Sequence, residues 1–392
     1  MFANLKNNPV IKVAQREIKR ILSSKDLVLI CFAAPIFYAA LFSYVYINKT
    51  PRDINIGVIN QDGRAQSRRF ERWIDASPEL KADKSYASVY ETFEGIFADK
   101  ISAFYFIPKN FGANLKKGRS AQGFNAANSS NFLVSTSVLK KLSFISALFA
   151  QKQYVKILSD KGVAYQAAKT SFSPLSPETK HIFNPQLAYS VFFLPCLLVA
   201  LLQQILLMAV CAAISLEKKE KTEKELYKTA GGRFSNVFFG KALPYIFIGA
   251  AASFLNSFLV LPLNDIYVQS VLALTLISTA FVIAAVFFAI LISVLFKSPE
   301  MAMAALMFYA MPAILLSGFA WPHHALPLFL KIVSYFIPST YSANYIRLFT
   351  LGDISAKYAI LPTLELLLFA ASCFFAAMFI EKAAAKRKRR LQ

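Results

Sequence analysis

Six long apolar runs dominate the hydrophobic pattern of this chain, and each exceeds 20 residues with at most one charged side chain. A bilayer core about 30 Å thick is crossed by about 20 residues that rise 1.5 Å each, so every run is long enough to span it. Soluble helices seldom lose every charge over such lengths, which disfavours six buried helices of a soluble protein. The runs cover residues 27–47, 187–216, 242–264, 266–296, 301–322 and 358–380.

The stretch 49–186 is different, because it is polar and basic, with 20 Lys/Arg and 11 Asp/Glu. Apolar residues alternate over 54–58 and return in 102–107, which predicts two strands. Helical patterns fill 90–98 and 130–161. Strands that alternate with helices are typical of a small α/β domain. The stretch shows no nucleophile–base pair and no close carboxylate pair, so we interpret it as a docking or gating domain.

Charge placement predicts the orientation. The chain has 392 residues and a formal net charge of +21, and basic residues gather in 1–26, in the loop 217–236 and in the tail 381–392. Short segments rich in Lys and Arg stay in the cytoplasm, so these three are predicted to be cytoplasmic and 49–186 extracytoplasmic. The four cysteines all fall inside apolar runs, which leaves no disulfide framework in the outer domain.

These patterns predict an α-helical polytopic membrane protein with six transmembrane helices and an α/β extracytoplasmic domain inserted between the first and second spans. The expected order is a cytoplasmic amphipathic connecting helix, the first span, the outer domain, a five-span bundle and a basic tail. A further apolar stretch near 326–337 is too short to span and is interpreted as re-entrant or interfacial. The predicted boundaries are 1–26, 27–48, 49–186, 187–380 and 381–392, with a coupling loop at 217–236 and an outer re-entrant segment at 322–340.

Two elements at the cytoplasmic edge are predicted helices. Apolar residues recur every three or four positions over 10–22, with Lys and Arg mostly on the opposite face. That periodicity favours a helix lying in the membrane interface over a plain basic flank. In the loop, Glu217 and Lys221 are four residues apart, as are Glu220 and Lys224, which supports a solvated helix. Charge alone does not decide whether this helix contacts a cytoplasmic subunit.

Four segments resemble motifs of the ABC type-2 exporter permease family, and they follow one another in the family's order. They are Phe183-Asn184-Pro185 before the second span (FNP), Gly240-Lys241 with Pro244-Tyr245 (GK-x-x-PY), Leu316 to Pro322 (LSGF-x-x-P), and Ile337 to Tyr341 followed by Arg347 (IP-x-TY…R). The stretch from Arg16-Glu17 to Asp26 is similar to the family's amino-terminal connecting helix. The resemblance covers essentially the whole chain.

The resemblance implies the permease subunit of an ATP-binding-cassette exporter. Arg16 and Glu17 of the connecting helix would then couple to the ATPase, together with Glu220 and Glu225, which match the outer glutamates of the family's E-R-G-T-x-E loop. The loop departs from that pattern, because Lys-Thr-Glu-Lys stands between the two glutamates. The family implies two permease copies or paralogues forming one path, and two nucleotide-binding subunits on the cytoplasmic side.

ATP and Mg are expected in those partner subunits, and no cofactor in this chain, because no GxxxxGK[ST] phosphate loop occurs. Lys241 is interpreted as a basic residue that snorkels to the cytoplasmic interface. The expected location is a bacterial inner membrane. In a cell with two membranes, the outer domain could dock a periplasmic adaptor protein. Membrane lipid is a further expected partner, and nucleic acid is not.

Three polar residues inside the spans are candidates for a path or gate. Glu365 lies about 11 Å into the last span. A carboxylate near the bilayer centre costs ~2.5–3.5 kcal/mol, so it is expected to face protein or water. Gln203 and Gln204 sit in the middle of the second run. Interhelix hydrogen bonding is the alternative for all three.

The predicted function is outward transport of hydrophobic or amphiphilic cargo through an apolar-walled path. Its main rival is a membrane-anchored sensor or scaffold whose outer domain binds a ligand, for which one span would suffice. An intramembrane enzyme would need a paired catalytic constellation in the spans, where Glu365 is the one acidic or basic side chain inside the six runs.

Overall fold

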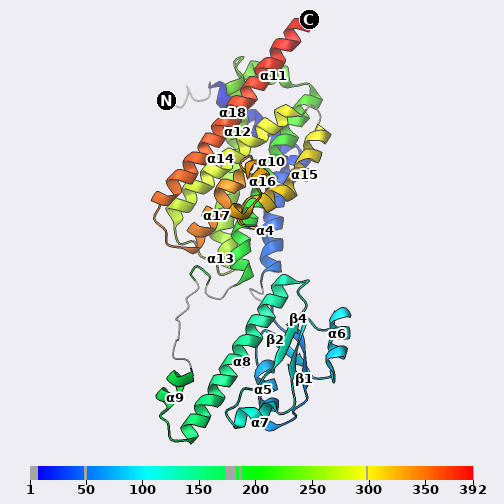
Figure 1. The fold of residues 1–392 in the computed structure, drawn as a ribbon. Coiled ribbons are helices and arrows are strands. Elements are labelled where there is room, and N and C mark those ends of the chain that lie inside the picture. The colour runs from blue at the N-terminus through cyan, green and yellow to red at the C-terminus, as the bar shows by residue number, and fades with distance from the viewer. Residues whose placement is uncertain (1–7, 48–50, 173–181, 185–187, 297–298, 392) are drawn as a thin grey trace. The chain divides into compact units, whose positions relative to one another are not determined.

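The computed structural model describes residues 8–47, 51–172, 182–184, 188–296 and 299–391. The chain divides into two compact units. We call Met1–Ile47 with His181–Gln392 the bundle unit, and Asn48–Lys180 the sheet unit. Figure 1 traces both from the amino to the carboxyl terminus.

The bundle unit is helical throughout its described length, and its first helix is α2 (Pro9–Ser23). The side chain of Asn8 caps α2 by accepting a hydrogen bond from the Val10 amide. A first long helix follows, as α3 (Lys25–Val28), the π-helical turn η1 (Leu29–Ala33) and α4 (Ala34–Val45). The remaining elements are α10 (Tyr189–Glu220), α11 (Glu223–Thr229), α12 (Phe234–Leu255), η2 (Asn256–Val260), α13 (Leu261–Leu263), α14 (Val271–Leu295), α15 (Pro299–Leu316), η3 (His323–Ala325), α16 (Leu328–Ser334), α17 (Pro338–Leu351) and α18 (Lys357–Leu391).

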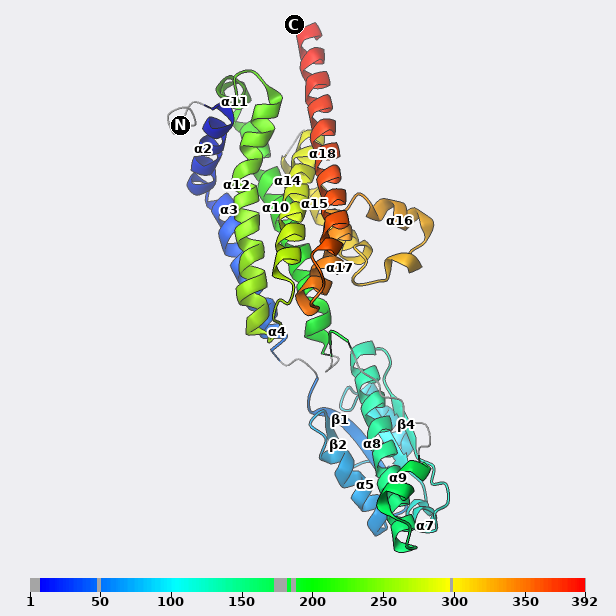
Figure 2. The same cartoon turned by 90° about the vertical axis from the view of Figure 1, so that its left-hand side faces the viewer.

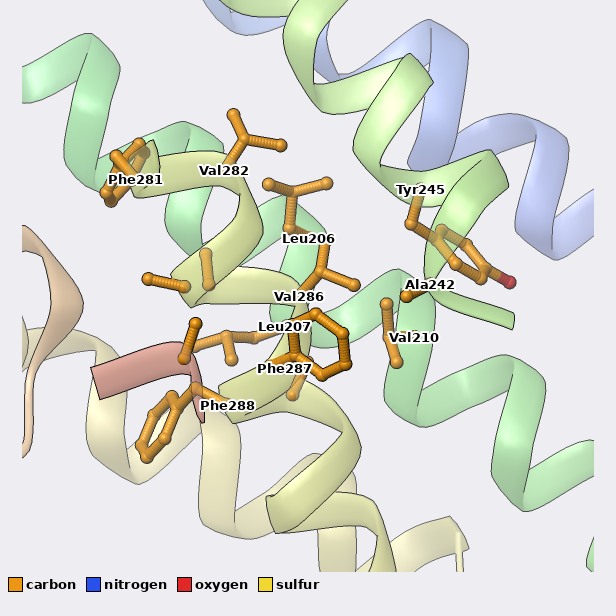
Figure 3. Close-up of a cluster of buried hydrophobic side chains, with 14 of the residues drawn as sticks. Leu206, Leu207, Val210, Ala242, Tyr245, Phe281, Val282, Val286, Phe287 and Phe288 are labelled. Atoms are coloured by element: carbon orange, nitrogen blue, oxygen red, sulfur yellow. The ribbon is translucent and has the colours of Figure 1, made fainter. Parts of the chain in front are cut away.

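The core of the bundle lies between α10, α12 and α14, and Figure 3 shows part of it. Helices α10 and α14 are mostly buried, whereas the first, third and last long helices expose large apolar side chains such as Phe37, Phe247 and Phe379. Gly249 brings α12 close, because a Cβ there would lie 2.7 Å from a methyl carbon of Val282. A bundle with an apolar exterior suits a hydrocarbon surrounding, where helices gain nothing by hiding such side chains.

Six helices in the described residues are long and apolar enough to cross a membrane. Five of them coincide with predicted spans. The sixth is α8 (Phe132–Asp160), which belongs to the sheet unit, whereas the predicted span 301–322 forms the shorter α15 and ends before the turn at Gly318. Six candidate helices were therefore predicted, but they are not the same six.

The sheet unit is the predicted α/β domain. Its four strands lie in the order β2-β1-β3-β4, with β1 parallel to both β2 and β3, and β4 antiparallel to β3. The two strands and two helices predicted above lie close to their expected positions, as does α5, because Phe70, Trp73 and Ile74 on one face predict a polar helix there. Elements β2, α7, β4 and α9 are additional. The elements are β1 (Ile54–Asn60), α5 (Ala65–Asp75), β2 (Leu80–Asp83), α6 (Val89–Phe97), β3 (Ala103–Ile107), α7 (Phe111–Lys116), β4 (Phe124–Ala127), α8 and α9 (Tyr165–Phe172). Most of the predicted chain break at 171–177 lies outside the described residues.

The apolar character of α8 is explained by the sheet rather than by a membrane. Val138, Leu142, Ile145 and Phe149 recur at helical spacing and are buried in one core with the strands. At the sheet edge, the ammonium group of Lys141 donates a 2.7 Å hydrogen bond to Glu79. Burial alone would raise the pKa of Glu79, but hydrogen bonds from Lys141 and Ser77 outweigh it and lower that pKa.

Candidate functional site

A cluster of charged residues lies where α2, α10, α11 and α12 meet, and we call it the charged corner. It consists of Arg16, Glu17, Arg20, Glu217, Glu220, Glu225 and Lys241. Helix α2 lies along α12 at this end of the bundle (Figure 2). The two helices approach closely at Gly240, where a Cβ would lie 2.5 Å from Cβ of Val13 and 2.8 Å from the Val10 carbonyl oxygen. A glycine is needed at that crossing.

Lys241 and Glu17 form the buried centre of the charged corner. Both side chains are at most 3% exposed, and 3.4 Å separates Lys241 Nζ from Glu17 Oε2. The hydroxyl of Tyr245, one turn after Lys241 on α12, donates a 2.9 Å hydrogen bond to Glu17 Oε1. Lys241 also contacts Glu217, another buried carboxylate at the end of α10. An unpaired charge in such a place costs several kcal/mol, roughly the desolvation penalty of one ion, so each member depends on the others.

Two arginines of α2 form the outer part of the charged corner. Arg20 Nη1 lies 2.8 Å from Glu217 Oε1, and the other end of its guanidinium contacts Glu220. Arg16 lies 3.9 Å from both Glu217 and Glu225. The side chain of Glu225 is 78% exposed, so the charged corner is buried at its centre and exposed to solvent at its outer edge. Through these pairs, α2 is joined to the last turn of α10 and to α11.

The structure brings together all four residues predicted to couple to an ATPase, but in unequal settings. Glu220 and Glu225 remain partly or largely exposed, Arg16 is half-buried, and Glu17 is buried. Whether they touch an ATPase stays a prediction. The interpretation of Lys241 as a snorkelling residue is wrong, because its ammonium group is buried between two carboxylates.

The predicted helical pair of Glu217 with Lys221 is also wrong. Lys221 has left-handed backbone angles (φ 59°) and ends α10, and Glu217 points toward α2 and α12 instead. Sequence reasoning missed Glu217 as a functional residue, although its place in the last turn of a long apolar run was a signal. Ile18 and Leu22 of the predicted apolar face of α2 are exposed, whereas Val13 is buried against the bundle, and contact of that face with a membrane stays a prediction.

Gln203 and Gln204 both hydrogen-bond across helices within this chain. Gln203 Nε2 donates to the Tyr309 hydroxyl (3.2 Å), and its Oε1 accepts from the Ser339 amide (2.8 Å) at the start of α17. Gln204 Nε2 donates to the Leu306 carbonyl oxygen (3.0 Å) on α15. Both side chains therefore connect α10 to its neighbours within one chain, whereas the alternative expected for them was hydrogen bonding at the contact between two permease copies. A role in a path stays a prediction.

The chain doubles back along α10 between α15 and α17. The ring of Phe319 lies 5.7 Å from that of Phe193, and Ser339 then meets Gln203, about 15 Å further along α10. Arg347 returns to the level of Phe192, with 4.7 Å from its guanidinium carbon to the ring centre. Helix α16 lies to the side of the bundle (Figure 2). The chain between α15 and α17 is therefore re-entrant relative to α10. How deeply the segment 322–340 enters a membrane stays a prediction.

Glu365 lies on α18 and is half-buried. Helix α18 packs against α17, where the hydroxyl of Tyr341 donates a 3.0 Å hydrogen bond to the Tyr335 carbonyl oxygen. A gating role stays a prediction. In the described part of the chain, no group of three or more His, Cys, Asp or Glu side chains is placed to hold a metal ion.

We expect Gln203→Leu to destabilise the bundle by about 1–3 kcal/mol, because the buried Ser339 amide would lose its acceptor. Gln204→Leu is the matched control and should cost less, since it deletes one donor from a carbonyl group that sits inside a helix. Thermal unfolding of the purified variants in detergent would measure both. Equal losses would contradict the special importance of the Ser339 bond.

Comparison with known proteins decides the family. A sequence model described as "ABC-2 family transporter protein" matches residues 25–380. The chain belongs to the ABC-2 transporter family. It is also similar to the "Probable multidrug ABC transporter permease YbhS" of Escherichia coli K12, with 24% identity over 401 residues that cover 98% of this chain and 100% of that protein. The protein of the same name from Escherichia coli O157:H7 matches equally well.

Membership of the ABC-2 family agrees with the many long apolar helices and makes this chain an ABC transporter permease in a membrane. Helix α2 precedes the matched region, so the partners of Glu17 on α12 lie inside that region while Glu17 lies outside it. The charged corner thus joins a segment before the family-defining part to the family-defining bundle.

Proposed function

We propose that this ABC-2 permease exports hydrophobic or amphiphilic cargo, and that separate ATPase subunits drive it through the charged corner. The observation that carries the proposal is the ionic connection of α2 to α10, α11 and α12. Helix α2 is held to the two long helices α10 and α12 by buried ion pairs and contacts α11 at the exposed edge, so a force on α11 can reach both long helices through it. Within α11, Glu223, Lys224 and Glu225 are exposed, and Leu226 anchors it to the core.

The force would act on α10 and α12 together. Both helices line the packed core around Leu206, Val210 and Val282, where close packing leaves no room for independent sliding (Figure 3). ATP and Mg would be held by the partner subunits. A second permease copy or a paralogue would complete the path, and a periplasmic adaptor is a further partner in a cell with two membranes. The named relatives are permeases of probable multidrug type, which supports apolar cargo.

The coupling proposal is tested by reversing both exposed glutamates of the corner. Glu220→Lys with Glu225→Lys should lower transport-linked ATP hydrolysis by about tenfold, because like charges placed at an interface cost several kcal/mol. The permease itself should still insert into the membrane, since both residues lie at the solvent-exposed edge of the charged corner. Co-purification of the ATPase subunit and its activity in liposomes are the measurements.

The matched control reverses two exposed acids of the sheet unit, Glu94→Lys with Asp160→Lys, which carry the same change in net charge. That variant should behave as wild type. Unchanged ATPase recovery and turnover in the Glu220 and Glu225 variant would show that this loop is not the contact.

The proposed orientation puts the charged corner and both termini in the cytoplasm of a bacterial inner membrane, and the sheet unit outside. The placement of Lys and Arg in the short segments between and beside the spans supports this orientation. In a variant without the four native cysteines, a cysteine at Ala121 should react with an impermeant thiol reagent in intact cells. A cysteine at Ala385 should react only after the membrane is opened, and the reverse pattern would overturn the orientation.

A further inference from the structure

Arg347 places a cation inside the bundle unit. It lies on α17, which packs between α10, α14 and α18. Cys196 of α10 contacts the Ala343 carbonyl oxygen one turn away, so the two helices touch at this level. The guanidinium lies over the ring of Phe192, about one turn from the beginning of α10. It therefore sits close to one end of the bundle rather than at its middle.

The guanidinium has more donors than acceptors. It carries five N–H groups, and Nη2 donates one 3.0 Å hydrogen bond to Asn344 Oδ1. Its Nη1 is shielded from solvent and has no hydrogen-bond partner among the residues that the structure describes. No ion pair to Arg347 occurs within that described part of the chain either. Phe192 neutralises no charge, although its ring attracts the cation.

A charged arginine at such a place needs an acceptor. Arginine and lysine within membrane-embedded bundles pair with other groups or face water, because an unpaired charge is costly there. The fork of a guanidinium matches the oxygen atoms of a phosphate or carboxylate, which it binds with two parallel hydrogen bonds. Phe192 is 41% exposed and offers an apolar wall beside the cation. The side chain of Arg347 is itself half-buried, so its accessible N–H groups can meet an anion, and Phe192 can contact a hydrocarbon chain.

We propose that Arg347, with Asn344 and Phe192, binds the oxyanion headgroup of a membrane amphiphile, a phosphate or carboxylate. With α10 spanning the bilayer as proposed, a position one turn from its end is at the level of the lipid headgroups. The side chain of Asn344 accepts a hydrogen bond from the guanidinium and lies beside Gly318. Gly318 (φ 87°) has no Cβ, which leaves room for the amide of Asn344. The site does not depend on transport, so it can be tested separately from the proposed function.

The test measures lipid binding to the full purified chain by native mass spectrometry. Phosphatidylglycerol and phosphatidylcholine with the same acyl chains are the two probes, because both carry a phosphate but only the first is anionic overall. Wild type should bind phosphatidylglycerol about tenfold more tightly than phosphatidylcholine, and Arg347→Gln should remove that preference. Lys357→Gln is the matched control: this lysine also lies over an aromatic ring, that of Tyr358, and its loss should leave the preference unchanged.

The outcomes separate the sources of the anion. Competition by excess inorganic phosphate would show that the oxyanion alone is recognised, and no competition would show that the whole headgroup is needed. Equal lipid preference in wild type and Arg347→Gln would overturn the proposal, as would a wild type with no preference, where water alone serves the cation. If Arg347→Gln does not fold, Arg347→Lys decides, because it keeps the charge but loses the fork: a loss of about threefold is expected, and unchanged binding contradicts the proposal.

Discussion

Replacing Lys241 with methionine should destabilise the permease more than any other single loss of charge in the chain. Glu17 would remain buried with the Tyr245 hydroxyl but without a cation, and Glu217 would keep Arg20 but lose the ammonium group. Removing one partner of a buried ion pair costs about 3–5 kcal/mol, because the other charge stays desolvated. For a domain of this size, that corresponds to a melting temperature lower by roughly 10 °C. Circular dichroism of the purified chain in detergent would follow the unfolding.

The control for this change is Lys12→Met, which removes an exposed lysine from α2. It should leave the melting temperature within about 1 °C of wild type, since exposed charges contribute little. A second variant combines Lys241→Met with Glu17→Gln and should recover part of the loss, because one of the stranded carboxylates is then neutral. If Lys241→Met melted like Lys12→Met, the buried corner would not be an ionic unit.

Gly240→Val should separate α2 from α12. A Cβ at this position would lie 2.5 Å from Cβ of Val13 and 2.8 Å from the Val10 carbonyl oxygen, and neither is the end of a flexible side chain. Relief requires α2 to move outward, which stretches the contacts of Glu17 with Lys241 and Tyr245. Overpacking costs about 1–3 kcal/mol in general, and the loss of the ionic centre adds to it. We expect α2 to become cleavable by protease at Lys12 and Arg16.

The same helix offers a control in Ala251→Val, which adds two methyl groups at an exposed position of α12. That variant should keep α2 resistant to protease and should melt as wild type. Equal protease resistance in the Gly240 and Ala251 variants would mean that α2 does not depend on the close crossing.

The long helices could be predicted because composition alone determines them. An uncharged run such as 266–296 is stable only in a membrane or in a protein interior. In either surrounding, a helix satisfies the hydrogen bonds of the backbone. Helix α8 is as long and apolar as a span, but its place in the polar, basic stretch 49–186 led to its prediction as a helix of the outer domain, and the structure packs it on the strands. Strands β2 and β4 have four residues each, too few for alternation to identify them, so their pairing with β1 and β3 defines them.

The charged corner was predicted in part for a similar reason. Motifs that lie within one continuous stretch are visible in a sequence, and the resemblance to the ABC type-2 exporter permeases marked Arg16, Glu17, Glu220 and Glu225 in this way. Pairs between helices are not visible: Arg20 meets Glu220 across 200 residues, and Tyr245 meets Glu17 across 228. The local signal was Gly240 followed by Lys241 and, four residues later, Tyr245. These residues indicate a buried acidic partner on another helix only when the close helix crossing at Gly240 is already known.

The 228 residues between Glu17 and Tyr245 also impose an order on synthesis. Chains grow at roughly 5–20 residues per second, so α2 leaves the ribosome roughly 10–45 s before α12 exists to receive it. During that interval Glu17 and the two arginines of α2 have no buried partners and must stay hydrated at the membrane surface. Helix α2 can dock only once the third long helix has been inserted and has turned Gly240 and Lys241 inward. The first described helix thus reaches its final place only after the third long helix has been made.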